Sequence, residues 1–220
     1  MKQTVIPFPL ALFLLCGLSI SVGGRAAASV DECPAITASA PNPYRGVFFD
    51  NDFSFLSDPC LARSDSRGRW ARLTDGWKRR RIGNTILFDI GGEYRLRYHN
   101  EDGNARTRLA GLDNSFVLSR LRAYLNVEAR GALRLYVEGL DAASVGEDQP
   151  SRGIEVNRWD FLNLFAEARA RTPNGGRLAV RIGRQELQFG AERLISPLDW
   201  GNTRRSFDGC GLITTPGTLR

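Results

Sequence analysis

Arginine dominates the groups that could do chemistry in this chain. All but two of its 30 cationic residues are arginines, the exceptions being Lys2 and Lys78, and the formal net charge is +6 over 220 residues. A guanidinium is always charged, and its planar fork suits carboxylate and phosphate groups. The single histidine, His99, argues against a histidine-based metal site or catalytic triad. The residue types therefore indicate recognition of anions, unless they only reflect base composition, and the positions of the arginines must decide.

Most of these arginines lie on one side of runs in which apolar and polar residues alternate. In residues 86–99 the even positions are mainly apolar and the odd positions mainly charged. A period of two predicts a β-strand with one apolar and one polar face. The same pattern recurs in four further runs, and a weaker one starts near Ser206; the four are 117–130, 133–138, 162–171 and 177–185.

The connections between these runs alternate in length. Long polar segments (100–115, 141–158 and 188–205) take turns with short ones at Gly131 and at 172–176. Outer-membrane barrels have this asymmetry, because their periplasmic turns are short and their external loops long. The slightly negative mean hydropathy also excludes a helical polytopic membrane protein. The sequence therefore predicts an all-β fold, an antiparallel transmembrane β-barrel of the outer-membrane type.

The number of strands is too small for a complete barrel. Five or six strands cannot close, since single-chain bacterial barrels start at eight. An open sheet edge would leave backbone groups unsatisfied in lipid. We therefore expect residues 84–220 to be the N-terminal part of a larger barrel, or a truncated product.

The residues before the first strand indicate export and a separate extension. A positive start at Lys2, an apolar stretch over 5–22 and an A-x-A-type site at 26–28 predict a signal peptide spanning 1–28. Residues 29–83 lack periodicity and predict an irregular periplasmic extension, with a short helix near 53–56 and a solvated turn at 78–81. In an oxidising compartment Cys33 and Cys60 are expected to form a disulfide, with Cys210 free and buried.

Several segments resemble a known family. They read GRQELQFG at 183–190, ERL at 192–194, PLDW at 197–200, RSFDG at 205–209 and DIGGEYRLRYH at 89–99. Together they resemble the alginate export family of outer-membrane porins over roughly residues 86–213. The resemblance implies an eighteen-stranded barrel with an electropositive lumen that passes a polyuronate outward.

The polar faces supply the candidate lumen residues. Arginine at the bilayer midplane costs about 2–4 kcal/mol, so these arginines should point into the lumen. Four glutamates should pair with them: Glu93, Glu128, Glu138 and Glu167. The candidate polymer-binding residues are Arg95, Arg97, Arg120, Arg122, Arg134, Arg169, Arg181, Arg184, Glu186, Arg193, Asp199, Arg205 and Asp208.

Alternatives stay open for this set. Arginine–glutamate ladders also brace barrel walls, and Arg184 with Glu186 could be a structural pair at a strand end rather than part of a constriction. The long segment around Asp199 could fold inward as a lid or filter, or only pack on its own wall. The positions do not decide between these readings.

The predicted function is a channel in the bacterial outer membrane, or the N-terminal fragment of one, for passive export of an anionic exopolysaccharide such as alginate through an arginine-lined lumen. The alternative is an exported β-sandwich that binds anionic glycans without transport. An enzyme is not expected, because the only clustered acids, Asp50 and Asp52 near Tyr44, lie in the irregular extension. No cofactor and no metal are expected. The expected partners are the polysaccharide, outer-membrane lipid and the barrel-assembly and export machinery, with no nucleic acid.

Overall fold

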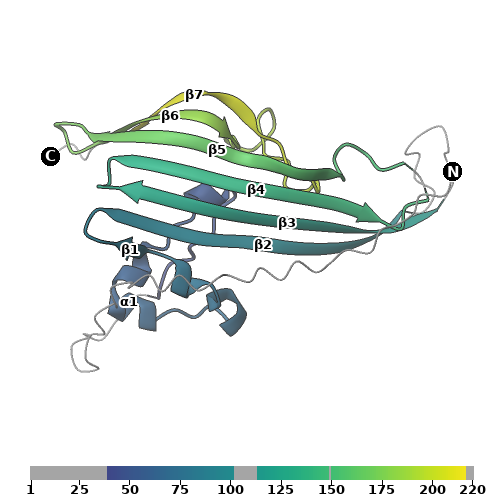
Figure 1. Cartoon of the computed structure of the whole chain (residues 1–220), viewed down its shortest axis with the longest axis horizontal. Coiled ribbons are helices and arrows are strands. Elements are labelled where there is room, and N and C mark those ends of the chain that lie inside the picture. Colours follow the sequence, from purple (N-terminus) through teal and green to yellow (C-terminus); the bar gives the residue numbers. More distant parts are fainter. Residues whose placement is uncertain (1–38, 102–112, 149, 217–220) are drawn as a thin grey trace.

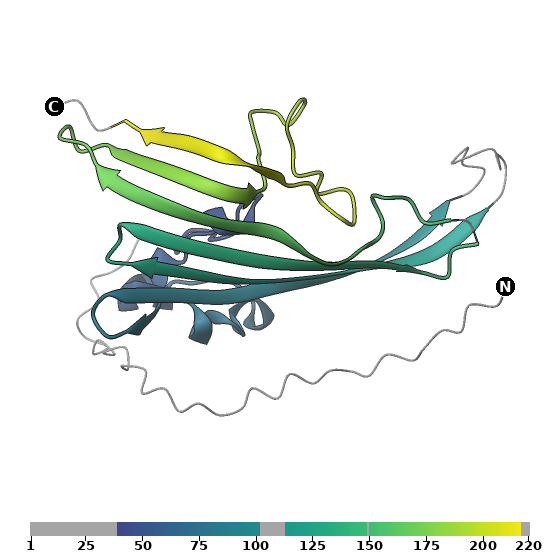
Figure 2. The same ribbon diagram turned by 45° about the horizontal axis from the view of Figure 1, so that its top comes forward.

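The described strands form one antiparallel sheet in the order β1-β2-β3-β4-β5-β6-β7 (Figure 1, Figure 2). This computed structural model describes residues 39–101, 113–148 and 150–216. Every strand therefore pairs with its neighbours in sequence, as in a meander, and the predicted all-β antiparallel fold is confirmed. The strands are β1 (Arg80–Ile82), β2 (Ile86–Glu101), β3 (Asn114–Ala129), β4 (Leu133–Val145), β5 (Asn157–Arg171), β6 (Arg177–Gln185) and β7 (Phe207–Thr215).

All six predicted strands exist, and two of them, β4 and β5, extend at least five residues beyond the alternating run. β4 continues past Glu138 to Val145, and β5 begins at Asn157. The pairing of β4 with β5 shifts register between Glu138 and Gly139 and again between Leu140 and Ala142. Such bulges interrupt the period of two, which explains why the pattern ends early in the sequence. Strand β1 adds three residues from the region expected to be irregular.

The two faces of the sheet differ sharply. One face, here called the outer face, exposes large apolar side chains; examples are Tyr94 (64%), Ile182 (61%) and Leu212 (67%). The other, the inner face, carries the charged residues, and Arg120 and Glu138 on it are buried. Among the described residues, no helix has the length and apolar character needed to span a membrane.

Between residue 39 and the sheet, the described chain is irregular and contains only short helices. Four are 3-10 helices: η2 (Phe48–Asp50), η3 (Ser54–Ser57), η4 (Arg69–Arg72) and η5 (Asp75–Trp77). The one α-helix, α1 (Pro59–Arg63), starts where Asp58 accepts hydrogen bonds from the backbone N–H groups of Cys60 and Leu61. An aspartate cap followed by proline is a favourable helix start. The helix expected near 53–56 corresponds to η3.

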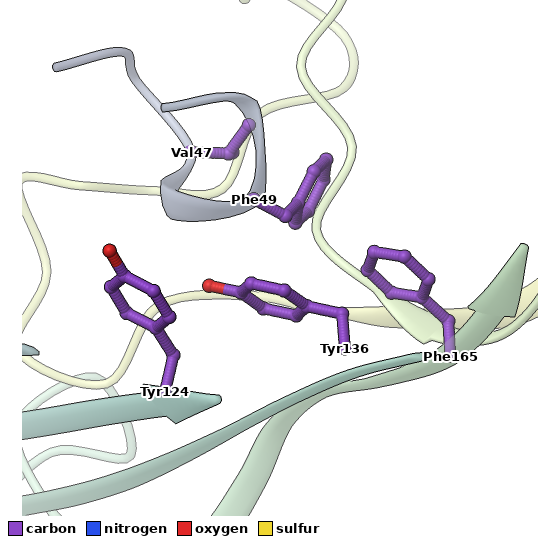
Figure 3. Packing of buried hydrophobic residues seen from close by; sticks show 5 residues of the cluster. All are labelled: Val47, Phe49, Tyr124, Tyr136 and Phe165. Atoms are coloured by element: carbon purple, nitrogen blue, oxygen red, sulfur yellow. The ribbon is translucent and has the colours of Figure 1, made fainter. Parts of the chain in front are cut away.

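Part of this extension packs against the inner face of the sheet (Figure 1). Val47 and Phe49 lie over three aromatic rings that come from β3, β4 and β5 (Figure 3). The ring of Tyr136 stacks between those of Tyr124 and Phe165, with centroids 5.6 and 5.3 Å away. The structure thus places residues 46–53 on the polar side of the sheet, a contact that the aperiodic sequence of the extension did not indicate.

Three expectations concern residues near the ends of the described chain. The signal peptide (1–28) and Cys33 lie outside the described residues, so export and the Cys33–Cys60 disulfide stay predictions. Cys210 is free, as expected. It is exposed rather than buried, because its position on β7 shares the outer face with Leu212.

Candidate lumen site

Seven of the candidate arginines project from the inner face, as the alternation predicts. They come from five neighbouring strands, so the sheet gathers onto one surface residues that are up to 86 positions apart in sequence. These residues are Arg95, Arg97, Arg120, Arg122, Arg134, Arg169 and Arg181. Local sequence proximity does not bring these arginines together. The antiparallel pairing of neighbouring strands does.

A buried ionic network occupies the centre of this face. The Arg122 guanidinium lies 2.6 Å from Glu138 and 3.3 Å from Glu186, and Arg204 also pairs with Glu186. The side-chain amide of Asn163 donates hydrogen bonds to both carboxylates, at 2.9 and 3.0 Å. All four charged side chains are at most 1% exposed. Charges this deeply buried are tolerated only because each one is paired.

The long segment 186–206 folds onto the inner face and completes this network. Arg120 contacts Glu93 at 2.7 Å and Asp199 at 3.2 Å, so a loop carboxylate reaches the strand arginines. Partial burial raises the pKa of Asp199, but the positive charges of Arg204 and Arg120 outweigh it and hold this pKa below its usual value. The segment thus packs on the inner face of its own sheet, and a role as a lid or filter stays a prediction.

Asn202 anchors the same segment to the sheet. Its side-chain amide lies 2.9 Å from the carbonyl oxygen of Ser119 on β3 and 3.3 Å from that of Ala143 on β4. It also donates to the carbonyl of Glu155, at 2.9 Å. Arg95 and Arg97 add hydrogen bonds to backbone carbonyls of residues 199–201. These two arginines therefore hold the inward segment in place.

A cavity of about 950 Å³ lies at the short-turn end of the inner face, between the sheet and residues 48–54. Its lining contains five carboxylates, which are Asp50, Asp52, Asp89, Glu128 and Glu167. It also contains seven arginines, which are Arg79, Arg130, Arg134, Arg169, Arg171, Arg177 and Arg181. The cavity therefore has a positive balance and is open to anionic ligands.

The arginines of this cavity fall into two kinds. On its wall, Glu167 lies 2.6 Å from Arg181 and 2.5 Å from Arg169, and Glu128 lies 3.3 Å from Arg169. With the contacts of Glu93 and Glu138, this confirms the expected glutamate–arginine pairing. At the rim the side chains are exposed, and within the described chain they take part in no ion pair; these are Arg130, Arg171 and Arg177.

Comparison with known proteins decides the family. The model of the alginate export family matches residues 87–217, well over half of the chain. The chain belongs to the alginate export family. This is a family of transport porins of the outer membrane, so the protein is of the alginate export type. Searches of curated proteins and of solved structures gave no match.

Four candidate residues of this family member lie away from the inner network. Arg184 pairs in register with Leu164 and Asp208, on the outer face, and its guanidinium lies 2.9 Å from the Asp208 carboxylate. Arg193 and Arg205 are exposed in the segment 186–206. The structure therefore does not bring Arg184 and Asp208 to the inner face, because both occupy the same alternation as the outward Ile182.

Lys78, expected in a solvated turn, is instead buried against the inner face of the sheet. Its ammonium group donates hydrogen bonds to the Ile90 carbonyl at 2.7 Å and to the Tyr124 hydroxyl at 2.6 Å. Gly91 leaves the space for it, since a Cβ there would lie 2.1 Å from the Lys78 nitrogen. Burial lowers the pKa of Lys78 to about 8. The prediction of a solvated turn is therefore wrong at this residue. The sequence feature that could have marked it is its type, since it is one of only two lysines among 30 cationic residues.

Asp50 and Asp52, the acids considered for catalysis, both line the cavity. Enclosure by protein raises the pKa of Asp50, and the nearby Arg181 and Arg134 oppose that rise only in part. Asp52 instead accepts a hydrogen bond from the backbone N–H of Ser54 at 2.8 Å, as a local turn residue does. Asp50 and Asp52 therefore lie where the extension contacts the arginines of the cavity.

Proposed function

We propose that this member of the alginate export family acts as an outer-membrane channel, or as the N-terminal part of one, for passive export of an anionic exopolysaccharide through a lumen bounded by its inner face. The observation that carries the proposal is the cavity at the short-turn end, where seven arginines face five carboxylates. A polyuronate carries one carboxylate per sugar, and guanidinium forks bind carboxylates without needing a cofactor.

The distribution of paired and unpaired arginines supports transport rather than tight binding. Rim arginines are free to meet a passing carboxylate, whereas wall arginines already have glutamate partners. Conduction requires sites that are favourable enough to enter and weak enough to leave. The partial neutralisation of the cavity by Glu128 and Glu167 therefore fits a path along which the polymer moves from site to site.

The exposed outer face supports contact with lipid. Its large apolar side chains include Tyr98 and Leu96, at 69% and 59% exposure. In water such a surface would promote association, whereas hydrocarbon solvates it. Delivery by a signal peptide and insertion by the barrel-assembly machinery are parts of the same proposal.

Conductance measurements test this function. The protein extracted from outer membranes should form anion-selective channels in planar bilayers, and an oligouronate should reduce the current while a neutral oligosaccharide of equal length should not. It should also stay in the membrane after carbonate washing and leave alginate undepolymerised. Cation selectivity, or recovery as a washable monomer that binds glycans, would overturn the channel and favour the binding-module alternative.

A further inference from the structure

We propose that residues 46–52, here called the plug, occupy the polymer path as an internal mimic of the polymer and leave it when an anionic polysaccharide enters. This inference rests on the proposed channel function and concerns its regulation. The plug lies on the inner face of the sheet, over the aromatic rings that the polymer would use (Figure 3).

Four inner arginines hold the plug. Arg134 donates a hydrogen bond to the Phe49 carbonyl at 2.6 Å, and Arg204 donates one to the Gly46 carbonyl at 3.0 Å. The other two stack on its rings: the Arg122 guanidinium carbon lies 3.7 Å from the Phe48 ring centre, and that of Arg181 lies 4.6 Å from the Phe49 ring centre. These groups come from β3, β4, β6 and the inward segment, so the plug bridges the width of the site.

The rings beneath the plug form a platform suited to sugars. Tyr124, Tyr136 and Phe165 stack in a row, and Phe49 meets the last two edge-on, at 5.8 and 5.2 Å between centroids. Flat aromatic faces pack well against apolar surfaces of comparable size, such as the C–H face of a pyranose ring. With the plug in place, Tyr136 and Phe165 are at most 2% exposed, so a sugar can reach them only after Phe49 moves.

The plug also supplies a carboxylate. Asp50 ends η2 and lines the cavity together with Arg134 and Arg181, whose positive charges favour its carboxylate form. The combination of apolar rings, carbonyl oxygens and one carboxylate reproduces the groups of a uronate residue. The polymer and the plug therefore compete for Arg134 and Arg181, the two of these arginines that line the cavity.

The plug can leave the inner face without disrupting the sheet, because no backbone strand pairing holds it there. It contains one 3-10 turn of three residues with no side-chain cap, and it belongs to no strand of the sheet. The rest of the extension has its own apolar cluster of Phe53, Phe55 and Leu56. This cluster can keep its packing while the plug, held to the sheet by side chains, is displaced.

The first test weakens the plug. Phe49→Ala should raise the open fraction of the channel in planar bilayers by at least about tenfold, because it removes the ring that covers the platform. Phe55→Ala is the matched control, since Phe55 is equally buried in the same extension but packs in the second cluster. Equal open fractions in wild type and Phe49→Ala, with both folded by heat-modifiable gel mobility, would overturn the plug.

The second test needs no destabilising change. Val47 is 3% exposed, so Val47→Cys in a Cys210→Ser background should react slowly with a thiol reagent. An oligomannuronate should speed this labelling at least about tenfold, and a neutral maltooligosaccharide should not. Unchanged labelling in a protein that conducts anions overturns the plug alone. Absence of anion-selective current in both wild type and Phe49→Ala, by contrast, overturns the channel function itself.

Discussion

The inner face has two regions that use the same residue type differently. At its centre, Arg122 and Arg204 are buried against Glu138 and Glu186 under the inward segment. At the short-turn end, arginines line an open cavity, and those at the rim stand without a described acidic partner. An arginine that is buried and paired with a carboxylate stabilises the fold, whereas an exposed arginine stays available to a ligand. The alternation alone cannot distinguish the two roles.

Removal of the central carboxylate should have the largest effect. Glu138→Ala leaves the buried Arg122 and the Tyr136 hydroxyl short of a partner, so the free energy of unfolding should fall by about 3–5 kcal/mol. Urea unfolding in detergent measures it. Glu128→Ala is the control from the cavity, where the half-open glutamate should cost about 1 kcal/mol or less. Equal losses in the two variants would remove the distinction between the regions.

Lys78, between the two regions, should give the protein a pH-dependent stability. Burial lowers its pKa from 10.5 to about 8, although Asp89 and Asp75 oppose this and Arg67 adds to it. Between these values the unfolded chain binds more protons, so the free energy of unfolding should rise with pH, by about 2 kcal/mol from about pH 8 to about pH 10 and by about 3 kcal/mol in all. Below about pH 8 Lys78 is protonated in both the folded and the unfolded chain, so it adds no pH dependence there and the full cost of burying its charge remains.

The variant Lys78→Met should lose that slope, and Arg81→Met, at an exposed cation three positions away, should keep it. Urea titrations at about pH 8 and about pH 10 compare them. A slope that survives in Lys78→Met would assign the pH dependence to another group.

The rim arginines should affect selectivity rather than stability. A variant with Arg130→Gln, Arg171→Gln and Arg177→Gln should lower the anion-to-cation permeability ratio by about threefold or more, because the mouth loses positive potential. Its free energy of unfolding should change by about 0.5 kcal/mol or less per substitution. Reversal potentials across a salt gradient give the ratio. An unchanged ratio would locate selectivity deeper in the site.

Arg184 should give the smallest effect. Arg184→Gln removes an exposed ion pair on the outer face, so stability should fall by about 1 kcal/mol or less and selectivity should stay the same. Arg181→Gln, on the inner face of the same strand, should lower selectivity. A drop in selectivity for Arg184→Gln would mean that its side chain reaches the lumen in the inserted protein.

The sequence was sufficient for the strands and for their two faces, because a period of two survives in any sheet with one apolar side. It also predicted the glutamate partners: Glu167 faces Arg181 in register, and Glu93 and Glu138 reach arginines of the neighbouring strand diagonally. Arg184 was misplaced because a motif was followed instead of the alternation, which continues from Ile182 to the outer face. At a strand end an arginine can face outward, since the cost falls toward the membrane interface.

The remaining features depend on contacts between distant segments. Glu186 joins the central network only because residues 186–206 fold inward, and no local pattern encodes that fold. The plug likewise has no periodicity, and its ring contacts with Tyr136 span 87 positions, from residue 49 to residue 136. Such contacts are decided by shape and charge after the sheet has formed.

The hydrogen bonds of Asn202 imply an order of events during folding. Two of its acceptors, the carbonyls of Ser119 and Ala143, belong to residues that face each other across β3 and β4. Before those strands pair, the two oxygens are not adjacent, and a slip of one residue would turn the wrong backbone groups toward the amide. Residues 186–206 can therefore dock only after β3 and β4 have paired in the correct register. The central ionic network, which includes residues of this segment, forms after that step.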